Sequence, residues 1–535
     1  MAGSKFGLLS LPIEVLLDTL AILDFISLLR CRKASRFFKH LVDNTSSLQY
    51  IIELAASGQV DGPIDKSINV FSRLQALKKQ QEAWHTGQWR QESDPDALNQ
   101  GGLWELYGGV LAQVAHDQSI TFHQLPSHVR GIEKRHWTIE PNTFEFTVRD
   151  FGIDPSQDLL VLIEPPSWSV VAADHLHRFH LRTMSTGERH PLAPQDAVFS
   201  HMQRDQDLML SYSIQISGDY VGVLLHRFEV SDNELMIWDW KKGQAKVNIL
   251  GDEVRSFQFL SDKHFIVCLT PMFEAVPTLA VFDIDSVSSE RHTLDEIKST
   301  FTLHYPGIRD EHMAFECQLR CDPAPSWRPS HDLKVPFSVD TENRIFIMSL
   351  WAHFQDTGMH CFISFIPRST FERCLSAVQN KQHEADFQWQ DWSPNGSRMI
   401  RSGFQHSMVW VTYVYGSRFV IGPDIDLDPD NSDDDDDDES LECGFLYDFN
   451  QLGLKRSLSK DPEAHSRSSE SENGWTEYVI GEQEIEGGQL FSDAIRTSLP
   501  YRLRRFRIPQ NLLRRPTVIL CSEDNLIFLN VSIFI

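Results

Sequence analysis

The chain has 535 residues and a formal net charge of −26, and 41% of its residues are hydrophobic. This length exceeds what one ordinary core holds, so we expect two or more domains or one large repeat architecture. The negative charge argues against nonspecific nucleic-acid binding, because a phosphate backbone would repel the chain. No segment reaches the ~18 consecutive apolar residues of a membrane helix. The sequence therefore predicts no nucleic-acid partner and no membrane partner.

The cysteines and histidines show no metal-binding spacing. Eight cysteines are scattered without a CxxC pair, which favours buried free thiols in a reducing compartment and hence a cytoplasmic and/or nuclear protein. The stretch HLHRFH brings His175, His177 and His180 together, but no cysteine or carboxylate stands at a spacing that completes a zinc site. Nucleophile-elbow, phosphate-loop, dinucleotide-binding and HExxH motifs are also missing. We therefore expect no catalytic residue, no metal, no cofactor and no enzyme activity.

Residues 8–52 form a short segment with apolar residues at helical spacing. Proline is favoured at the first position of a helix, so Pro12 predicts a helix that runs to about Ala21. A second helix is predicted from Asp24 or Ser27, and a third over 34–42. Three such helices bury too little area to be robust alone. Leftover apolar surface of this kind indicates a partner interface, although a small helical cap on the rest of the chain is the alternative.

The stretches LSLPIEVLL and SLLRC within this segment resemble an F-box, which we assign to residues 1–57. The resemblance implies that the segment docks onto the Skp-type adaptor of a cullin–RING ubiquitin ligase. Carried over to this sequence, it also implies that the adaptor interface contains Leu11, Pro12, Ile13, Leu16, Leu17, Leu28, Leu29 and Cys31.

Residues 58–100 follow as a helical linker. Phe71, Leu74 and Leu77 recur at helical spacing among good helix formers. This helix is either a lever that fixes the F-box relative to the next domain or an ordinary connection.

From residue 101 onward, short runs of Val, Ile, Phe, Thr and Trp alternate with turn residues. One motif, a strand followed by a turn and an apolar run, recurs at Phe151, Ile214, Phe257, Phe337 and Trp392. A second motif, a strand that ends in a turn, recurs at Phe179, Ile237 and Val281. The spacing of 43 residues between Ile214 and Phe257 is typical of a propeller blade.

The stretch LMIWDWKKGQ resembles the strand end of a WD-repeat blade. We therefore predict an α+β multidomain protein, similar to fungal F-box proteins, with a mainly antiparallel β-propeller over 101–535. We expect six to eight blades and favour seven; a two-sheet sandwich is the alternative. The last strands should help to close the ring beside the first ones, since closure removes exposed edges.

Two further segments of this domain have distinctive charge. Residues 423–488 contain the aspartate run Asp433–Asp438 and Ser-rich stretches, and are predicted to form a disordered insert around a short ordered piece. The stretch YRLRRFR supplies four arginines that could bind an acidic or phosphorylated target. The alternative is that they neutralise the chain's own carboxylates. These four residues are Arg502, Arg504, Arg505 and Arg507.

Together these features predict a substrate-recognition subunit of an SCF-type cullin–RING E3 ubiquitin ligase. The F-box would bind the adaptor, and the β domain would bind a target protein that the sequence does not identify. A scaffold that works outside the ligase would have the same sequence features. A propeller enzyme is the third hypothesis, and it requires carboxylates or histidines that converge at the central channel.

Overall fold

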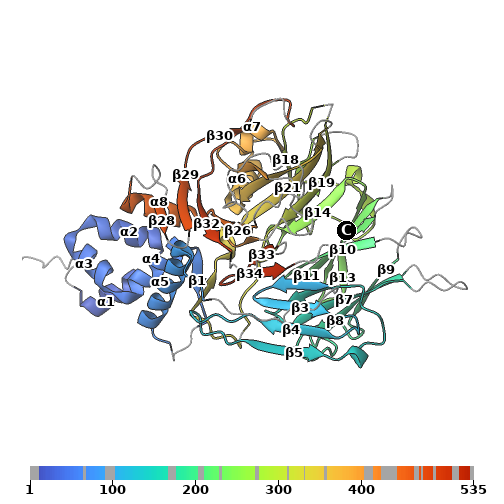
Figure 1. The fold of residues 1–535 in the computed structure, drawn as a ribbon, viewed down its shortest axis with the longest axis horizontal. Coiled ribbons are helices and arrows are strands. Elements are labelled where there is room, and N and C mark those ends of the chain that lie inside the picture. The colour runs from blue at the N-terminus through green and yellow to red at the C-terminus, as the bar shows by residue number, and fades with distance from the viewer. Residues whose placement is uncertain are drawn as a thin grey trace, which may run out of the picture.

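The structure of the chain is a computed structural model, in which a helical N-terminal part packs against a ring of β-sheets (Figure 1). It describes residues 11–63, 68–90, 103–166, 176–202, 210–227, 232–270, 276–309, 312–330, 332–354, 358–402, 414–422, 443–462, 469–471, 474–485, 490–508 and 517–530.

Four short helices make up the N-terminal region: α1 (Ile13–Ala21), α2 (Phe25–Ala34), α3 (Arg36–Asn44) and α4 (Ser46–Ser57). The first three agree with the predicted helices, and α4 is an addition to them. Helix α2 begins where the Asp24 carboxylate accepts a hydrogen bond from the Ser27 amide, at 2.9 Å. Helix α3 begins where the Ser35 hydroxyl accepts one from the Phe38 amide, at 3.2 Å. Polar caps of this kind satisfy amides that have no partner inside the helix.

Helix α5 (Val70–Thr86) is the predicted linker helix. Its N-terminus is capped by the Asn69 side chain, and Gly87 ends it with a φ of +65°, a conformation that glycine adopts without strain. The strand β1 (Gln59–Asp61) precedes it and pairs antiparallel with β20 (Phe337–Val339) of the ring. The linker is therefore joined to the β domain by backbone hydrogen bonds as well as by the chain.

The first three blades are antiparallel sheets whose strands follow one another in sequence. Their four principal strands come in chain order, as a propeller requires. They are β2 (Trp104–Tyr107), β3 (Val110–Val114), β4 (Ile120–Gln124) and β5 (Arg135–Ile139); β6 (Asp150–Asp154), β7 (Leu159–Glu164), β8 (Leu176–Thr183) and β9 (Val198–Met202); and β10 (Leu210–Ser217), β11 (Tyr220–Arg227), β12 (Asn233–Asp239) and β13 (Gln244–Gly251), with β17 (His292–Thr293) added at the edge of the third.

The next three blades follow the same plan with additions. The fourth contains β14 (Val254–Phe259), β15 (His264–Leu269), β16 (Thr278–Asp283), β18 (Phe301–His304) and β23 (Asp386–Phe387). The fifth contains β19 (Met313–Arg320), β21 (Ile345–Phe354), β22 (Gly358–Pro367) and β24 (Arg398–Ser402). The sixth contains β25 (Val414–Tyr415), β26 (Arg418–Ile421), β27 (Cys443–Asp448), β32 (Tyr501–Arg507), β29 (Gly474–Val479) and β28 (Ser469–Ser471).

The described residues thus form a propeller of six blades, as the six sheets of four or more strands show. Six lies within the expected range of six to eight and is one fewer than the seven that we favoured. Apolar clusters fill the spaces between neighbouring blades, and each cluster draws buried side chains from two adjacent sheets. These interfaces, rather than a single core, stabilise the domain.

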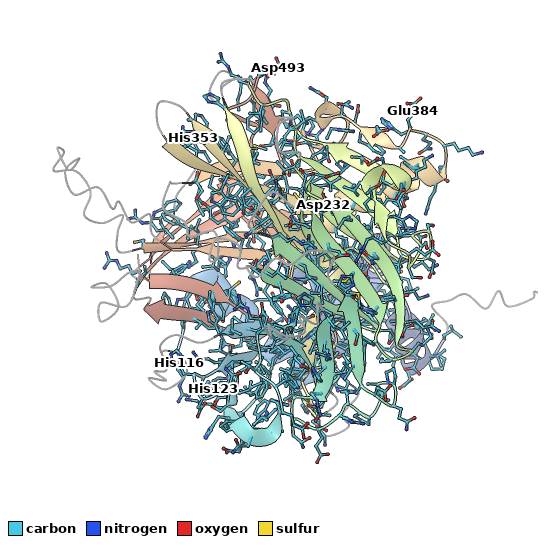
Figure 2. All side chains as sticks on the ribbon, turned by 90° about the vertical axis from the view of Figure 1, so that its right-hand side faces the viewer. His116, His123, Asp232, His353, Glu384 and Asp493 are labelled. Atoms are coloured by element: carbon cyan, nitrogen blue, oxygen red, sulfur yellow. The ribbon has the colours of Figure 1, made fainter. Side chains whose placement is uncertain are left out.

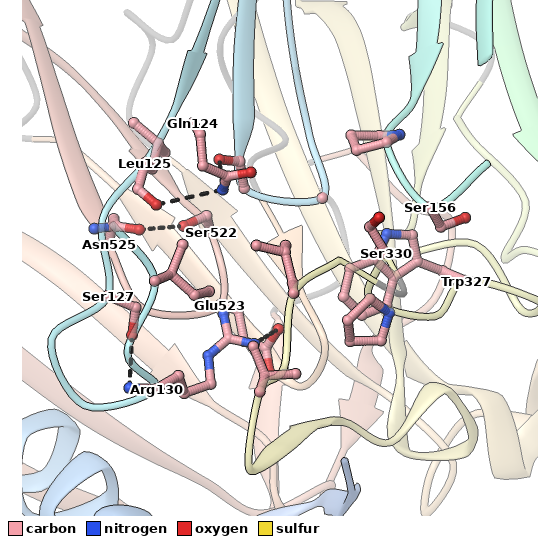
Figure 3. A pocket seen from close by; sticks show the side chains of 17 residues that line it. Gln124, Leu125, Ser127, Arg130, Ser156, Trp327, Ser330, Ser522, Glu523 and Asn525 are labelled. Carbon is pink, nitrogen blue, oxygen red and sulfur yellow. Dashed lines mark hydrogen bonds and ion pairs between the residues drawn. The ribbon is translucent and has the colours of Figure 1, made fainter. Parts of the chain in front are cut away.

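A two-stranded hairpin, β33 (Thr517–Cys521) with β34 (Leu526–Asn530), lies between the sixth and the first blade. Buried Leu520 packs against Leu106 and Leu111 of the first blade, with Ile527 at the border of the same cluster. Figure 3 shows the hairpin turn beside Arg130, whose guanidinium lies 2.9 Å from the Glu523 carboxylate. The predicted meeting of the first and last strands is confirmed.

The strand motif found in the sequence is confirmed at three of its five positions. Phe151, Ile214 and Phe257 lie in β6, β10 and β14, the first strands of their blades. Phe337, by contrast, lies in β20, and Trp392 ends the short helix α7 (Trp389–Trp392). The apolar spacing alone did not separate a blade strand from a strand or helix that connects two blades. The first strand of the fifth blade is β19.

Part of the segment 423–488 is folded, unlike the predicted insert. The ordered piece expected there corresponds to β27 and to α8 (Gln451–Lys460). The strands β28 and β29 extend the sixth blade beyond it, and β30 (Gln483–Ile485) pairs with β31 (Ile495–Thr497). The aspartate run lies outside the described residues. The Ser-rich composition did not reveal β29, which pairs with the arginine-rich β32, or β28, which pairs with β29. The described part of the propeller also contains the helix α6 (Arg368–Gln379).

Candidate adaptor-binding surface and arginine cluster

The N-terminal helices have a core of their own. Leu28 is fully buried in it, together with Leu16, Leu20, Leu41 and Val42. The cluster also takes in Leu48 of α4 and contains no residue of the propeller. This small core fixes the positions of α1, α2 and α3 relative to one another.

The outside of the same helices is unusually apolar. Six large hydrophobic side chains of this region are exposed, and Ile22, between α1 and α2, is 84% exposed. An apolar side chain in water contributes nothing to folding, so this concentration indicates a contact with another molecule. The six residues are Leu11, Ile13, Val15, Ile22, Ile26 and Phe37, and we refer to them as the apolar surface of the F-box.

The residues that the resemblance assigned to an adaptor interface fall into three groups. Leu11, Pro12 and Ile13 are exposed at the start of α1. Leu16 and Leu28 are buried in the local core and hold the helices together. The third group is half-buried: Leu17 and Cys31 lie at the border of that core, and Leu29 is half-buried without being part of it. Four exposed residues were not among those assigned, namely Val15, Ile22, Ile26 and Phe37. The motif does not reveal which side of a short helix is left uncovered.

The fourth helix attaches this region to the propeller. The Glu53 carboxylate of α4 is buried and forms an ion pair with Arg456 of α8, with an N–O distance of 2.6 Å for one of the two bonds. The Tyr50 hydroxyl donates a hydrogen bond of 2.7 Å to the Pro336 carbonyl oxygen. The side chains of α4 also pack with Phe337 and with α5. Figure 1 shows α1 and α3 on the far side of α4 from the propeller.

Two of the four arginines singled out in the sequence bind the end of α5. Arg504 is buried and donates hydrogen bonds to the carbonyl oxygens of His85, at 2.8 Å, and Thr86. Arg502 forms an ion pair of 2.7 Å with the Asp448 carboxylate and contacts the His85 ring. Their guanidinium groups are therefore occupied inside the chain. Arg502 thus pairs with a carboxylate of the chain, as the alternative predicts, whereas Arg504 bonds backbone carbonyl oxygens.

Burial and these charges shift two pKa values. Burial alone would raise the pKa of Asp448, but Arg502 and Arg418 lower it below its usual value. Burial lowers the pKa of His85 to about 4, with Arg502 and Arg504 adding to the effect. His85 is thus neutral at physiological pH and suited to lie against an arginine.

The other two arginines lie on the opposite face of β32. Arg507 is exposed, and Arg505 is half-buried. The alternation follows from the strand, in which successive side chains point to opposite faces. Of the four arginines, Arg507 is thus the exposed one.

Among the described residues, no group of three or more histidine, cysteine or acidic side chains could hold a metal ion. His177 and His180 are both buried in β8. His180 contacts the Glu164 carboxylate at 2.7 Å, so it lies in the blade rather than on the surface. Figure 2 shows other titratable residues, among them His353 and Glu384, at separate places on the propeller. Within the described ranges, no helix is long and apolar enough to cross a membrane.

Comparison with known families identifies the N-terminal region. Residues 8–50 match the F-box domain family. The chain therefore carries an F-box domain at its N-terminus, followed by a six-bladed β-propeller in its described residues. A search of curated proteins gave no match.

Solved structures resemble the propeller at low similarity. Sqt1 of Chaetomium thermophilum, bound to the N-terminus of ribosomal protein L10, is 12% identical at a TM-score of 0.23 and aligns with 49% of this chain. The chain spans 56% of that Sqt1 chain. Hsv2 of Kluyveromyces lactis is 9% identical at a TM-score of 0.21, and the alignment covers 45% of this chain and 77% of the Hsv2 chain. An oligogalacturonate lyase in complex with manganese is 9% identical at a TM-score of 0.30, and the alignment covers 77% of this chain and 97% of the lyase chain. We draw no functional argument from these TM-scores.

Proposed function

We propose that this chain is a substrate-recognition subunit of an SCF-type cullin–RING ubiquitin ligase. Its F-box would bind a Skp-type adaptor, and its propeller would bind a target protein. The observation that carries the proposal is the apolar surface of the F-box, six exposed hydrophobic residues on a domain with its own buried core. Burial of this surface by an adaptor would be favourable by about 25 cal/mol per Å² of apolar area.

The attachment of the F-box to the propeller supports the second half of the proposal. A ligase subunit has to hold its target at a defined distance from the adaptor, which requires a fixed link between the two domains. Here β1–β20 pairing, the Glu53–Arg456 ion pair and the bonds from Arg504 to α5 supply that link. The ubiquitin transfer itself would be carried out by other subunits.

Adaptor binding is tested with substitutions on the exposed side chains. The variants Ile13→Asp and Ile26→Asp place carboxylates in the proposed interface, where burying an unpaired charge costs several kcal/mol. We expect at least a 100-fold loss of affinity for a purified Skp-type adaptor in a titration. Leu28 is unsuitable for this test because it is buried, and its substitution would unfold the F-box.

Phe71→Asp is the matched control. Phe71 is also an exposed hydrophobic residue, 58% accessible, but it lies on α5 outside the apolar surface. This variant should bind the adaptor like the unchanged chain. If Ile13→Asp and Ile26→Asp keep full affinity while remaining folded, the adaptor proposal is wrong.

The scaffold remains the second candidate, because an adaptor-bound chain does not have to join a cullin. Affinity purification from cells with the proteasome blocked separates the two. Recovery of adaptor, cullin and RING subunit favours the ligase subunit, and recovery of the adaptor without the cullin favours the scaffold.

A further inference from the structure

A polar pocket lies in the propeller where three consecutive blades meet. Its lining comes from the first strands of the third, fourth and fifth blades, β10, β14 and β19, and from the neighbouring β11. The side chains that can donate hydrogen bonds into it include Arg255, Arg320, Gln215 and Gln318. His226 completes this set, with its Nε2 atom 3.2 Å from the Ser213 hydroxyl.

The two arginines of this pocket have unused donors. The Nε atom of Arg255 is buried and has no hydrogen-bond partner. Within the described part of the chain, neither the Arg255 nor the Arg320 guanidinium has a hydrogen bond or an ion pair closer than 4 Å. A buried N–H group without an acceptor, such as the Nε–H of Arg255, is costly because it loses water without a replacement. Two half-buried guanidiniums that bond no acceptor of the described chain are unexpected at one pocket of a protein with a net charge of −26.

The backbone presents Arg255 in an unusual way. The register of β14 against β15 shifts between Val254 and Ser256, so Arg255 is the extra residue of a β-bulge. A bulge re-aims the side chain of the inserted residue and recurs next to binding sites. The Ser256 hydroxyl, adjacent to it, accepts a hydrogen bond of 2.8 Å from the Leu319 amide, which ties the bulge to β19.

The nearest carboxylates do not neutralise these arginines by contact. Arg255 lowers the pKa of Glu316 electrostatically, and Arg320 lowers those of Glu105 and Asp322, but none of these pairs lies within 4 Å in the described residues. Burial raises the pKa of Glu316 and of Glu105 to about 7 and that of Asp322 to about 6, so the two glutamates carry only part of their negative charge at neutral pH, while Asp322 keeps most of its charge. The guanidiniums that line the pocket are thus left without a carboxylate in contact, and their donors are available to a negatively charged group.

We propose that the pocket between β10, β14 and β19 binds a small oxyanion, such as a phosphate or sulfate group, through the Arg255 and Arg320 guanidiniums. The glutamine amides would supply further hydrogen bonds from both sides. The site is separate from the apolar surface of the F-box and does not rest on adaptor binding. The ligand of this site would be an oxyanion, which is either a free ion or a group carried by a larger molecule.

The test measures anion binding to the full chain. We titrate it with sodium sulfate, against sodium chloride at matched ionic strength, and follow the melting temperature and the heat of binding. Sulfate should raise the melting temperature, because a ligand that binds only the folded state stabilises it. The variants Arg255→Gln and Arg320→Gln should each lower the sulfate affinity about tenfold or more, as expected for the loss of a charge-assisted hydrogen bond.

Arg496→Gln is the matched control, because Arg496 is exposed and forms its ion pair with Glu484 in the hairpin β30–β31. It should leave the sulfate effect unchanged. Binding of inorganic phosphate alone would indicate a free anion. Tighter binding of a phosphoserine amide would indicate a presented side chain, and either result supports the site.

A second measurement separates binding from a structural role. Without sulfate, Arg255→Gln should melt at the same temperature as the unchanged chain or higher, because it removes a charge that has no partner. The proposal is overturned if sulfate has no effect beyond that of chloride, or if both variants respond to sulfate like the unchanged chain. A lower melting temperature of Arg255→Gln without any sulfate effect would also assign the arginine to the fold alone.

Discussion

Arg504 joins two parts of the chain that lie 419 residues apart in the sequence, because it donates to the carbonyl oxygen of His85. The last carbonyl groups of a helix have no partner within it, and here a guanidinium from β32 supplies the hydrogen bonds. Gly87 follows the helix, and a Cβ atom at this position would meet the Arg504 side chain at 2.5 Å. The sequence identified Arg504 as unusual, but such a distant partner has no local signal.

Replacing Arg504 with methionine should lower the free energy of unfolding by about 2–4 kcal/mol. The apolar part of the side chain is kept, so the loss comes from the unpaired carbonyl oxygens at the end of α5. Urea unfolding followed by tryptophan fluorescence measures the change. Arg507→Met is the control, since Arg507 is exposed and should change stability by less than about 0.5 kcal/mol. Equal effects of the two variants would contradict this role of Arg504.

Glu316 makes the stability of the propeller depend on pH. Burial raises its pKa from 4.5 to about 7 despite the opposing effect of Arg255. The folded state therefore binds a proton that the unfolded state releases between pH ~4.5 and ~7, and this contribution to stability is lost as the pH rises through 7. Glu316→Gln removes the titration, so the variant should lose less stability than the unchanged chain between pH 6 and pH 8. Urea unfolding at both pH values measures it.

Glu188→Gln is the control for this measurement, because Glu188 is exposed on the same domain. It should follow the pH dependence of the unchanged chain. If Glu316→Gln is destabilised equally at pH 6 and pH 8, the Glu316 carboxylate is charged at both and acts as the partner of Arg255.

At the scale of elements, the strands that were predicted well are those with a regular apolar pattern and a turn at their end. The β12–β13 hairpin of the third blade is of this kind. In its turn the Asp239 carboxylate accepts a hydrogen bond of 3.0 Å from the Lys242 amide. The strands β28 and β29 were missed because they stand in a Ser-rich, charged stretch, and β29 pairs with β32, which lies later in the chain. Pairing with a distant strand leaves no signal in the local sequence.

The closing hairpin β33–β34 is the element with the clearest structural role. Truncation after Arg515 would remove both strands and expose Leu106 and Leu111 of the first blade, together with the side of β26 that the hairpin covers. Exposed strand edges and apolar faces lead to association between chains. We expect the truncated chain to aggregate, as measured by size-exclusion chromatography with light scattering. A monomeric truncation that melts cooperatively would show that the ring is stable without the hairpin.

At the scale of the whole molecule, the linker helix α5 is held against the propeller by side-chain contacts. Trp84 of α5 is buried in a cluster with Phe506 and Ile519 of the propeller, and the Arg418 guanidinium lies 4.4 Å from the centre of its ring. The F-box and the propeller were predicted as separate domains because their apolar periods differ. Their fixed arrangement depends on single contacts between distant residues, which composition and period do not contain.

The contacts of α4 should therefore control how firmly the F-box is held without affecting its partner. In the double variant Tyr50→Phe, Glu53→Gln, the hydrogen bond to Pro336 and the full charge opposite Arg456 are lost. We expect faster hydrogen exchange of the α4 amides, unchanged exchange in the inner strands of the propeller, and unchanged affinity for the adaptor. Arg32→Gln, which breaks the exposed Arg32–Asp43 pair inside the F-box, should leave exchange in α4 as it was. Exchange in α4 that stays slow in the double variant would contradict this role. The β1–β20 pairing and the apolar contacts with Phe337 would then hold the F-box on their own, and the Glu53–Arg456 ion pair would have no part in fixing the angle between the two domains.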